Sequence, residues 1–176
     1  GFSSIFHRPA HSESHPRNAI RKCELGTQSR RTEPWRWVVY RGVGRKGLLE
    51  DFERSYRAGV APEKQDEKKV EKSKRKILGS DTIIGIVMTR DPKERIPEWE
   101  EVAAVGMAVQ NFWLSLDALS IGGYWSSPGY LTRDPKALRR MEAGERCLGL
   151  FYLGFHECPE LPRERGDWRE KVRWVE

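Results

Sequence analysis

The stretch TEPWRWVVY, residues 32–40, combines aromatic and β-branched side chains with a proline near its start. Such side chains are enriched in β-strands, and Pro34 and Gly42 bound the run on either side. The stretch therefore predicts a strand over residues 35–40.

Helix and strand patterns alternate regularly after this strand. Leu48, Leu49 and Phe52 have helical spacing and predict a helix over 46–56. The charged run 63–76 predicts a second, mostly exposed helix. Further elements are predicted downstream: a buried strand over 83–89, a short strand running into a loop over 124–129, a short helix over 135–141 and a buried strand over 147–153.

The most informative helix is predicted over residues 98–119, directly after Pro97. Its first turn is acidic (EWEE), which the positive end of the helix dipole favours. The following VAAVGMAVQNFWLSLDAL is apolar on nearly every face, so the helix must be covered by a core or by a partner subunit. The residues leave both options open. The run Ile121-Gly122-Gly123 is expected to end this helix, because glycine is favoured at helix C-termini.

The tail over residues 158–176 is rich in proline and arginine and then extended. Its Trp168, Val172 and Trp174 show little helical period. This C-terminal arm is therefore expected to lie on another surface.

Length and composition point to one globular domain, residues 1–176. Seven Trp and six Phe argue against a disordered chain, although 33% of the residues are charged. No apolar run approaches the roughly 18 residues that cross a bilayer, so no membrane association is expected. The three cysteines lack CxxC spacing and residues 1–6 lack a signal-peptide pattern, so we expect a cytoplasmic protein with neither disulfides nor metal.

The excess of positive charge is concentrated near the start of the chain. Residues 7–31 hold six of the 32 Lys and Arg residues and two of the 26 Asp and Glu residues, and the net charge is +6. A basic, Trp-rich chain fits a nucleic-acid-binding module. No RNP, zinc-finger or helix-turn-helix signature accompanies the charge, so we favour a solvated surface and expect no nucleic acid partner.

The usual catalytic constellations are missing from the sequence. Three histidines fall within residues 7–15 and the fourth is His156, without metal-ligand spacing. There is no nucleophile elbow, P-loop or dinucleotide fingerprint. Cys147 precedes a core strand and is expected to be a buried, inert thiol. If the chain is an enzyme, a cofactor must carry the chemistry.

Four motifs together resemble the FMN-dependent nitroreductase family. They are TEPWRWVV, PEWEEVAAVG with AVQN, GGYWSS and LGLFYLG, in the family's order and spacing over residues 32–176. The resemblance implies an α+β, three-layer fold with a central, mostly antiparallel sheet flanked by helices. It also implies an obligate homodimer, with helix 98–119 at the interface and two FMN sites that are each built from both subunits.

The resemblance also implies an activity. Hydride passes from NAD(P)H to FMN, the nicotinamide leaves, and a small-molecule electron acceptor of the nitroaromatic or quinone type binds the same face. The flavin carries the chemistry, so no catalytic side chain is expected. The protein's share is to hold the flavin, expose one face and stabilise charge near the ring.

Two segments match family elements that contact FMN. Trp125, Ser126 and Ser127 match the loop that contacts the flavin ring, with the packing of an aromatic at a strand end as the competing interpretation. Ser4 matches the serine of the element that binds the phosphate.

Four arginines are further candidates. Arg163 and Arg165 in the tail are expected to pair with the FMN phosphate, because guanidinium binds phosphate bidentately. Arg30 and Arg31 are expected beside the phosphate or the nicotinamide. Surface solubility is the alternative role of the tail arginines.

The first 31 residues depart from the family. The family begins with an Arg-Arg-Ser element and has a W-A-P-x-H loop before TEPW. Here residues 3–6 keep the serine without the arginines, and residues 23–29 read CELGTQS. Leu25 and Ser29 stand where the family has Trp and His, so they are expected to be poor flavin ligands.

An out-of-frame translation explains this departure. One permitted coding of residues 23–29 is TGC GAA CTG GGC ACC CAA TCA, followed by the C of an arginine codon. Read from its second base, it encodes Ala-Asn-Trp-Ala-Pro-Asn-His, which is the missing loop, directly before Arg30. We therefore interpret roughly residues 7–29 as out of frame; a divergent N-terminus is the alternative.

Two other classes of function stay open. The missing elements leave the flavin phosphate and ring with few contacts, which fits a non-enzymatic relic or binding protein on the same fold. A basic nucleic-acid-binding module is the other class, and its affinity would fall steeply with salt.

Overall fold

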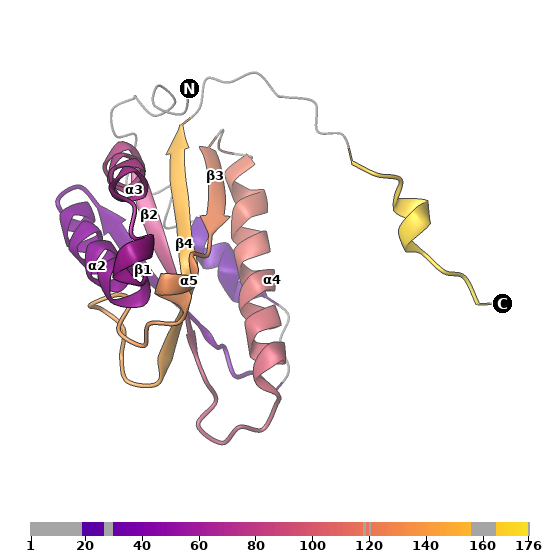
Figure 1. Cartoon of the computed structure of the whole chain (residues 1–176). Helices are drawn as coiled ribbons and strands as arrows, with labels where there is room; N and C mark the ends of the chain where they lie inside the picture. Colours follow the sequence, from indigo (N-terminus) through magenta and orange to yellow (C-terminus); the bar gives the residue numbers. More distant parts are fainter. Residues whose placement is uncertain (1–18, 27–29, 118, 120, 156–164, 176) are drawn as a thin grey trace.

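The computed structural model describes residues 19–26, 30–117, 119, 121–155 and 165–175. Four strands form an antiparallel sheet in the order β1-β2-β4-β3 (Figure 1). Their bounds are β1 (Trp35–Arg41), β2 (Thr82–Thr89), β3 (Ile121–Ser126) and β4 (Glu145–Phe155). The strands predicted over 35–40, 83–89 and 147–153 are confirmed.

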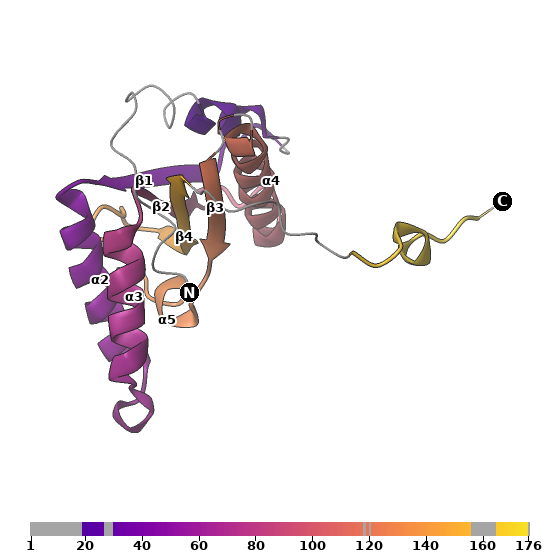
Figure 2. The same cartoon turned by 90° about the horizontal axis from the view of Figure 1, so that it is seen from above.

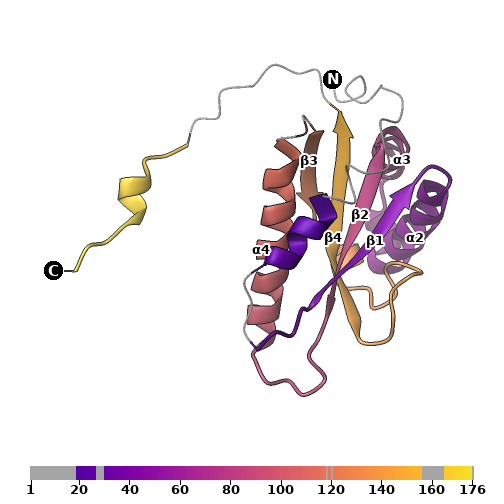
Figure 3. The ribbon, with the colours of Figure 1, turned by 180° about the vertical axis from the view of Figure 1, so that it is seen from behind.

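Helices cover both faces of the sheet, so the molecule has three layers (Figure 2). One face carries α2 (Gly44–Gly59), α3 (Glu67–Gly79) and the short α5 (Gly129–Thr132). The other carries α4 (Glu98–Asp117), against which the 3-10 turn η1 (Lys22–Leu25) packs (Figure 3). Two further 3-10 turns are η2 (Pro62–Lys64) and η3 (Trp168–Lys171). The predicted α+β class, with an antiparallel sheet flanked by helices, is confirmed.

Each face of the sheet has its own core, because successive strand residues point to opposite faces. Ile84, Ile86 and Phe151 belong to the core on the α4 side. Their neighbours Ile83 and Leu150 belong to the core under α2 and α3. All five side chains are at most 2% exposed, so β2 and β4 are the buried centre of the sheet.

The prediction that Gly122 and Gly123 end the central helix is wrong, because both lie within β3. A Cβ on Gly123 would come within 2.5 Å of the Phe151 ring and 2.9 Å of the Tyr152 carbonyl oxygen. Glycine is therefore needed here for the close approach of β3 to β4, not for a helix cap.

The helix predicted over 135–141 is also wrong, because these residues form turns. Side chains of α2 hold this segment. The buried carboxylate of Asp51 accepts a 2.9 Å hydrogen bond from the Arg139 backbone N–H, and Arg54 donates to the Ala137 carbonyl at 3.1 Å. Backbone groups bound to α2 in this way are not available for helical hydrogen bonds.

Candidate functional site

The sheet is irregular beside the end of β3. Ile86 pairs with Gly149 whereas Val87 pairs with Cys147, so Leu148 forms a β-bulge in β4. Bulges are common next to active sites, where they redirect side chains. Gly149 has a φ of 136°, and a Cβ there would come within 2.5 Å of both Ser126 O and Trp125 Nε1. The bulge and its glycine therefore bring the end of β3 tightly onto β4.

Trp125 is fixed by this bulge. Its indole Nε1 donates a 3.0 Å hydrogen bond to the carbonyl oxygen of Leu148, and its ring packs against the core on the α4 side. The indole N–H has no further hydrogen bond to give, so Trp125 offers a ligand only its ring surface. Ser126 is half-buried and Ser127 is exposed, and no described residue forms a hydrogen bond with either hydroxyl.

A second unusual segment precedes β1, and we call residues 30–34 the arch. Arg30, Arg31 and Glu33 have φ values of 59°, 51° and 44°, in the left-handed region that non-glycine residues rarely occupy. Arg36 donates 2.8 Å hydrogen bonds to the carbonyl oxygens of Glu33 and Trp35. The arch is therefore held in its strained conformation by the strand that follows it.

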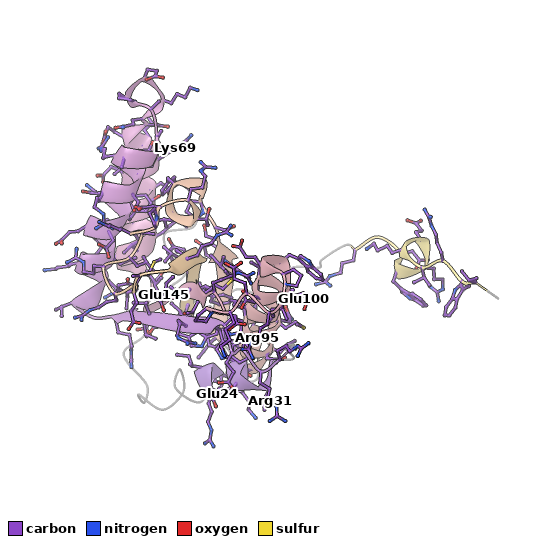
Figure 4. All side chains as sticks on the ribbon, turned by 90° about the horizontal axis from the view of Figure 1, so that it is seen from below. Glu24, Arg31, Lys69, Arg95, Glu100 and Glu145 are labelled. Carbon is purple, nitrogen blue, oxygen red and sulfur yellow. The ribbon has the colours of Figure 1, made fainter. Side chains whose placement is uncertain are left out.

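The arch presents two cations beside an unsatisfied hydroxyl. Arg30 and Arg31 are exposed, and neither forms an ion pair with a described residue. Thr32 Oγ1 is buried and has no hydrogen-bond partner. Figure 4 shows Arg31 on the same side of the molecule as Glu24 of η1.

The structure does not bring the predicted site residues together within one chain. Residues 125–127 end β3 at one edge of the sheet, whereas the arch precedes β1 at the other edge. Three strand spacings, about 14 Å, separate these edges. Arg165 is exposed on the C-terminal arm, and Leu25 is 69% exposed on η1. Ser4, Ser29 and Arg163 lie outside the described residues.

The described residues enclose little space between η1 and the sheet. A cavity of about 10 Å³ lies there, lined by Cys23, Trp37, Phe112 and neighbouring apolar side chains. An open hollow of about 600 Å³ lies along η1 against Arg21, Lys22, Glu24 and Leu25. A large ligand therefore does not fit the enclosed cavity and needs an open or shared surface.

Sequence reasoning missed an ion-pair network at the start of α4. The carboxylate of Glu101 is fully buried and accepts hydrogen bonds from Arg90 and from the backbone N–H of Asp91. Arg95 binds Asp91 with a 2.7 Å contact and lowers the pKa of that carboxyl to about 2. The i, i+4 spacing of Asp91 and Arg95 is a signal for this pair, whereas the acidic first turn of α4 indicates only an interaction with the helix dipole and not the buried contacts of Glu101.

Other titratable groups do not form a catalytic set in the described residues. Burial raises the pKa of the Cys147 thiol to about 11 and that of Cys23 to about 12, as expected for inert thiols. No group of three His, Cys, Asp or Glu side chains that could hold a metal occurs in the described part of the chain.

One face of α4 is apolar and uncovered. Trp99 is 69% exposed, Met107 42% and Leu114 59%, and Ala103 between them is also exposed. Their spacing places them along one stripe, which we call the α4 stripe. The predicted helix is confirmed, but this chain buries only its opposite side. None of the described helices is sufficiently long and apolar to traverse a membrane.

Known proteins match this chain in sequence and in fold. The model of the nitroreductase family matches residues 28–155. YdjA of Escherichia coli K12, whose name describes an NAD(P)H nitroreductase, is 26% identical over 148 residues, which cover 83% of this chain and 78% of YdjA.

Solved structures share the fold. A nitroreductase-like family protein from Bacillus cereus superposes with a TM-score of 0.82 at 24% identity, over 98% of this chain and 89% of that one. A variant of NfnB from Sphigopyxis sp. strain HMH, described as an FMN and NADPH-dependent nitroreductase, gives a TM-score of 0.74 at 13% identity, over 97% and 92% of the two chains.

Proposed function

Because the chain belongs to the nitroreductase family, an oxidoreductase family, we propose that it binds FMN and passes hydride from NAD(P)H to a nitroaromatic or quinone-like acceptor. The observation that carries the proposal is the end of β3, which packs against Gly149 of β4. There the Leu148 carbonyl fixes the Trp125 ring, and Ser126 and Ser127 follow with hydroxyls that bind no described residue. Bound FMN supplies hydride transfer, a chemistry that no side chain provides.

The donors present fit an anionic, aromatic cofactor. Ser126 and Ser127 can donate hydrogen bonds to a ligand. The Thr32 hydroxyl can do so too, because it forms no hydrogen bond with a described residue. Arg30 and Arg31 are not needed for this fit, and their guanidiniums are free to bind a phosphate group of the nicotinamide nucleotide. The half-buried ring of Trp125 would offer an aromatic cofactor an apolar surface.

The proposal includes a homodimer. The β3 end and the arch lie at opposite edges of the sheet, so two subunits can complete a site that neither encloses alone. The α4 stripe provides an apolar surface for the contact. Figure 1 shows residues 165–175 of the C-terminal arm in yellow. Trp168 on this arm is 58% exposed and Trp174 is 80% exposed, so the arm also carries apolar surface that a partner subunit can cover.

The test is a flavin absorption spectrum of the purified full chain after incubation with excess FMN. We expect a bound flavin band and acceptor-dependent oxidation of NAD(P)H with a nitroaromatic or a quinone. The double variant Ser126→Ala, Ser127→Ala should weaken FMN binding, whereas Ser73→Ala on α3 should not. A wild-type chain that binds no flavin even in the presence of excess FMN contradicts the proposal.

A further inference from the structure

We infer that Arg30 and Arg31 form a binding site for a phosphate monoester, and that the 2′-phosphate of NADPH occupies it. The inference rests on the proposed function and makes it narrower, because NADH has no such phosphate. Arg30 and Arg31 are consecutive in sequence, exposed and without described ion-pair partners, and the next residue, Thr32, has a buried hydroxyl without a hydrogen-bond partner. Together these features point to a missing anion.

The conformation of the arch supports a binding role. A left-handed conformation is unfavourable for a residue other than glycine, and Arg30 and Arg31 adopt it consecutively, with φ values of 59° and 51°. Such strain persists where surrounding contacts fix it, and here the Pro34 carbonyl accepts a 2.8 Å hydrogen bond from the Thr89 backbone N–H. The arch thus has a fixed base on the sheet and a cationic tip.

The charge of the arch selects the type of ligand. A phosphate monoester carries a charge of about −1.5 to −2 near pH 7, which two guanidiniums balance, whereas each phosphate of a dinucleotide bridge carries a single charge. Bidentate Arg–phosphate hydrogen bonds add direction to this attraction. The arch should therefore bind the 2′-phosphate of NADPH more strongly than the two bridging phosphates, which NADPH and NADH share. This difference would make the arch select NADPH over NADH.

Two ligands of the proposed reaction carry a phosphate monoester, FMN and NADPH. In the single chain both arginines are exposed, just before the edge strand β1, a position that suits a co-substrate that enters and leaves at each turnover. A tightly held cofactor usually has its phosphate in a covered site. The exposure of the arch therefore favours NADPH.

The experiment compares the wild-type full chain with the double variant Arg30→Gln, Arg31→Gln. Isothermal titration with 2′,5′-ADP and with 5′-AMP reports the 2′-phosphate directly and needs no turnover. We expect the wild type to prefer 2′,5′-ADP by about tenfold to a hundredfold and the variant to lose this preference. Arg41→Gln, at the other end of β1, is the matched control and should keep it.

Two further measurements separate the sources of phosphate. The KM for NADPH should rise in the double variant while the KM for NADH and the FMN dissociation constant stay within about twofold. A weakened FMN affinity with an unchanged nucleotide preference assigns the arch to FMN and overturns the inference. An unchanged preference and an unchanged FMN affinity show that the arch binds no phosphate, which also overturns it.

The same measurements distinguish a failure of the proposed oxidoreductase function from a failure of the 2′-phosphate inference. A chain that binds no flavin but still prefers 2′,5′-ADP retains the phosphate site and loses the oxidoreductase proposal. A chain that oxidises both nucleotides equally well, without a 2′-phosphate preference, keeps the function and loses this inference.

Discussion

The backbone N–H of Asp91 donates a 2.8 Å hydrogen bond to the carboxylate of Glu101, a side chain that is fully buried in the first turn of α4. Arg90 binds the other oxygen of the same carboxylate. One acidic side chain therefore joins the loop after β2 to the helix that carries the α4 stripe.

Replacing Glu101 should destabilise the fold. Glu101→Ala leaves Arg90 and a buried backbone N–H without their acceptor, and breaking a buried pair in this way costs about 3 kcal/mol. Urea unfolding measures the loss. Glu100→Ala, one residue earlier on the same turn, should cost less than about 1 kcal/mol. Equal losses in the two variants would contradict the assigned role of Glu101.

Asp91 should give the fold an acid-sensitive component. Arg95 lowers the pKa of Asp91 to about 2, below its ordinary value of 3.8. A depressed carboxyl pKa adds stability that is complete above the unfolded value and is lost as the pH falls through the folded value. The stability difference between wild type and Asp91→Asn should therefore shrink between about pH 4 and pH 2.

Urea unfolding at several pH values checks the Asp91 prediction. Asp167→Asn, on the exposed C-terminal arm, is the control and should leave the pH profile unchanged. A difference between wild type and Asp91→Asn that stays constant down to pH 2 contradicts the prediction.

Elements with a strong local signal were predictable from the sequence. β1, β2 and α4 follow from apolar runs or periodicity that need no distant partner. The placement of Gly123 in β3 and the turns around Arg139 were not predictable, because they depend on Phe151 and Asp51, which are distant in sequence.

The candidate site was predictable only in part. Residues such as Trp125 could be found from the motif, but the bulge at Leu148 is a property of strand register, which a sequence pattern does not show. The left-handed conformation of Arg30 and Arg31 runs against the preference of arginine, so local propensity gives no signal for it.

Gly149 should tolerate no side chain. In Gly149→Ala the new Cβ meets Ser126 O and Trp125 Nε1 at 2.5 Å, and the φ of 136° is strained for alanine. We expect a loss of roughly 2–4 kcal/mol in the free energy of unfolding. Gly79→Ala, where a Cβ meets nothing within 4 Å, should change it by less than about 1 kcal/mol.

The same Gly149 variant should affect the proposed site. Displacing the end of β3 moves Ser126 and the Trp125 ring together, so FMN affinity should fall more in Gly149→Ala than in Gly79→Ala. A folded Gly149→Ala protein with unchanged FMN affinity would show that the bulge does not position the residues that bind FMN.

The α4 stripe should control the oligomeric state. Leu114→Lys places a charge in the proposed subunit contact, so sedimentation velocity at micromolar concentration should show a shift from dimer to monomer. Leu78→Lys, at a comparably exposed position on α3, should leave the dimer intact. A wild-type chain that sediments as a folded monomer contradicts the homodimer.

The encoding DNA should contain the alternative reading of residues 23–29. We expect the shifted frame to encode Ala-Asn-Trp-Ala-Pro-x-His directly before Arg30. A DNA sequence whose shifted frames contain no such loop removes the out-of-frame interpretation and leaves a divergent N-terminus.

Flavin content should depend on this segment. The chain with the present sequence, which we call the literal chain, lacks the Arg-Arg-Ser element and the W-A-P-x-H loop of the family's FMN site. Each would supply charge-assisted hydrogen bonds worth roughly 1.5–3 kcal/mol. Losing several such bonds weakens binding by a few powers of ten, since every 1.4 kcal/mol is about tenfold. We expect the literal chain to purify colourless or partly loaded, and a chain with the restored frame to purify yellow.

The packing around η1 determines whether the loop encoded by the restored frame can be accommodated. The restored frame places alanine at positions 23 and 26. Cys23 is 1% exposed, so the smaller alanine fits its position. At position 26 the new Cβ would lie 3.3 Å from Ala108 Cβ and 3.3 Å from the Trp35 ring. Ala108 and Trp35 must move by a few tenths of an ångström to accommodate the restored loop. Absorption spectra of both chains after incubation with FMN, together with their thermal unfolding, distinguish the outcomes. A restored chain that is folded but shows no flavin band favours the non-enzymatic relic over the oxidoreductase.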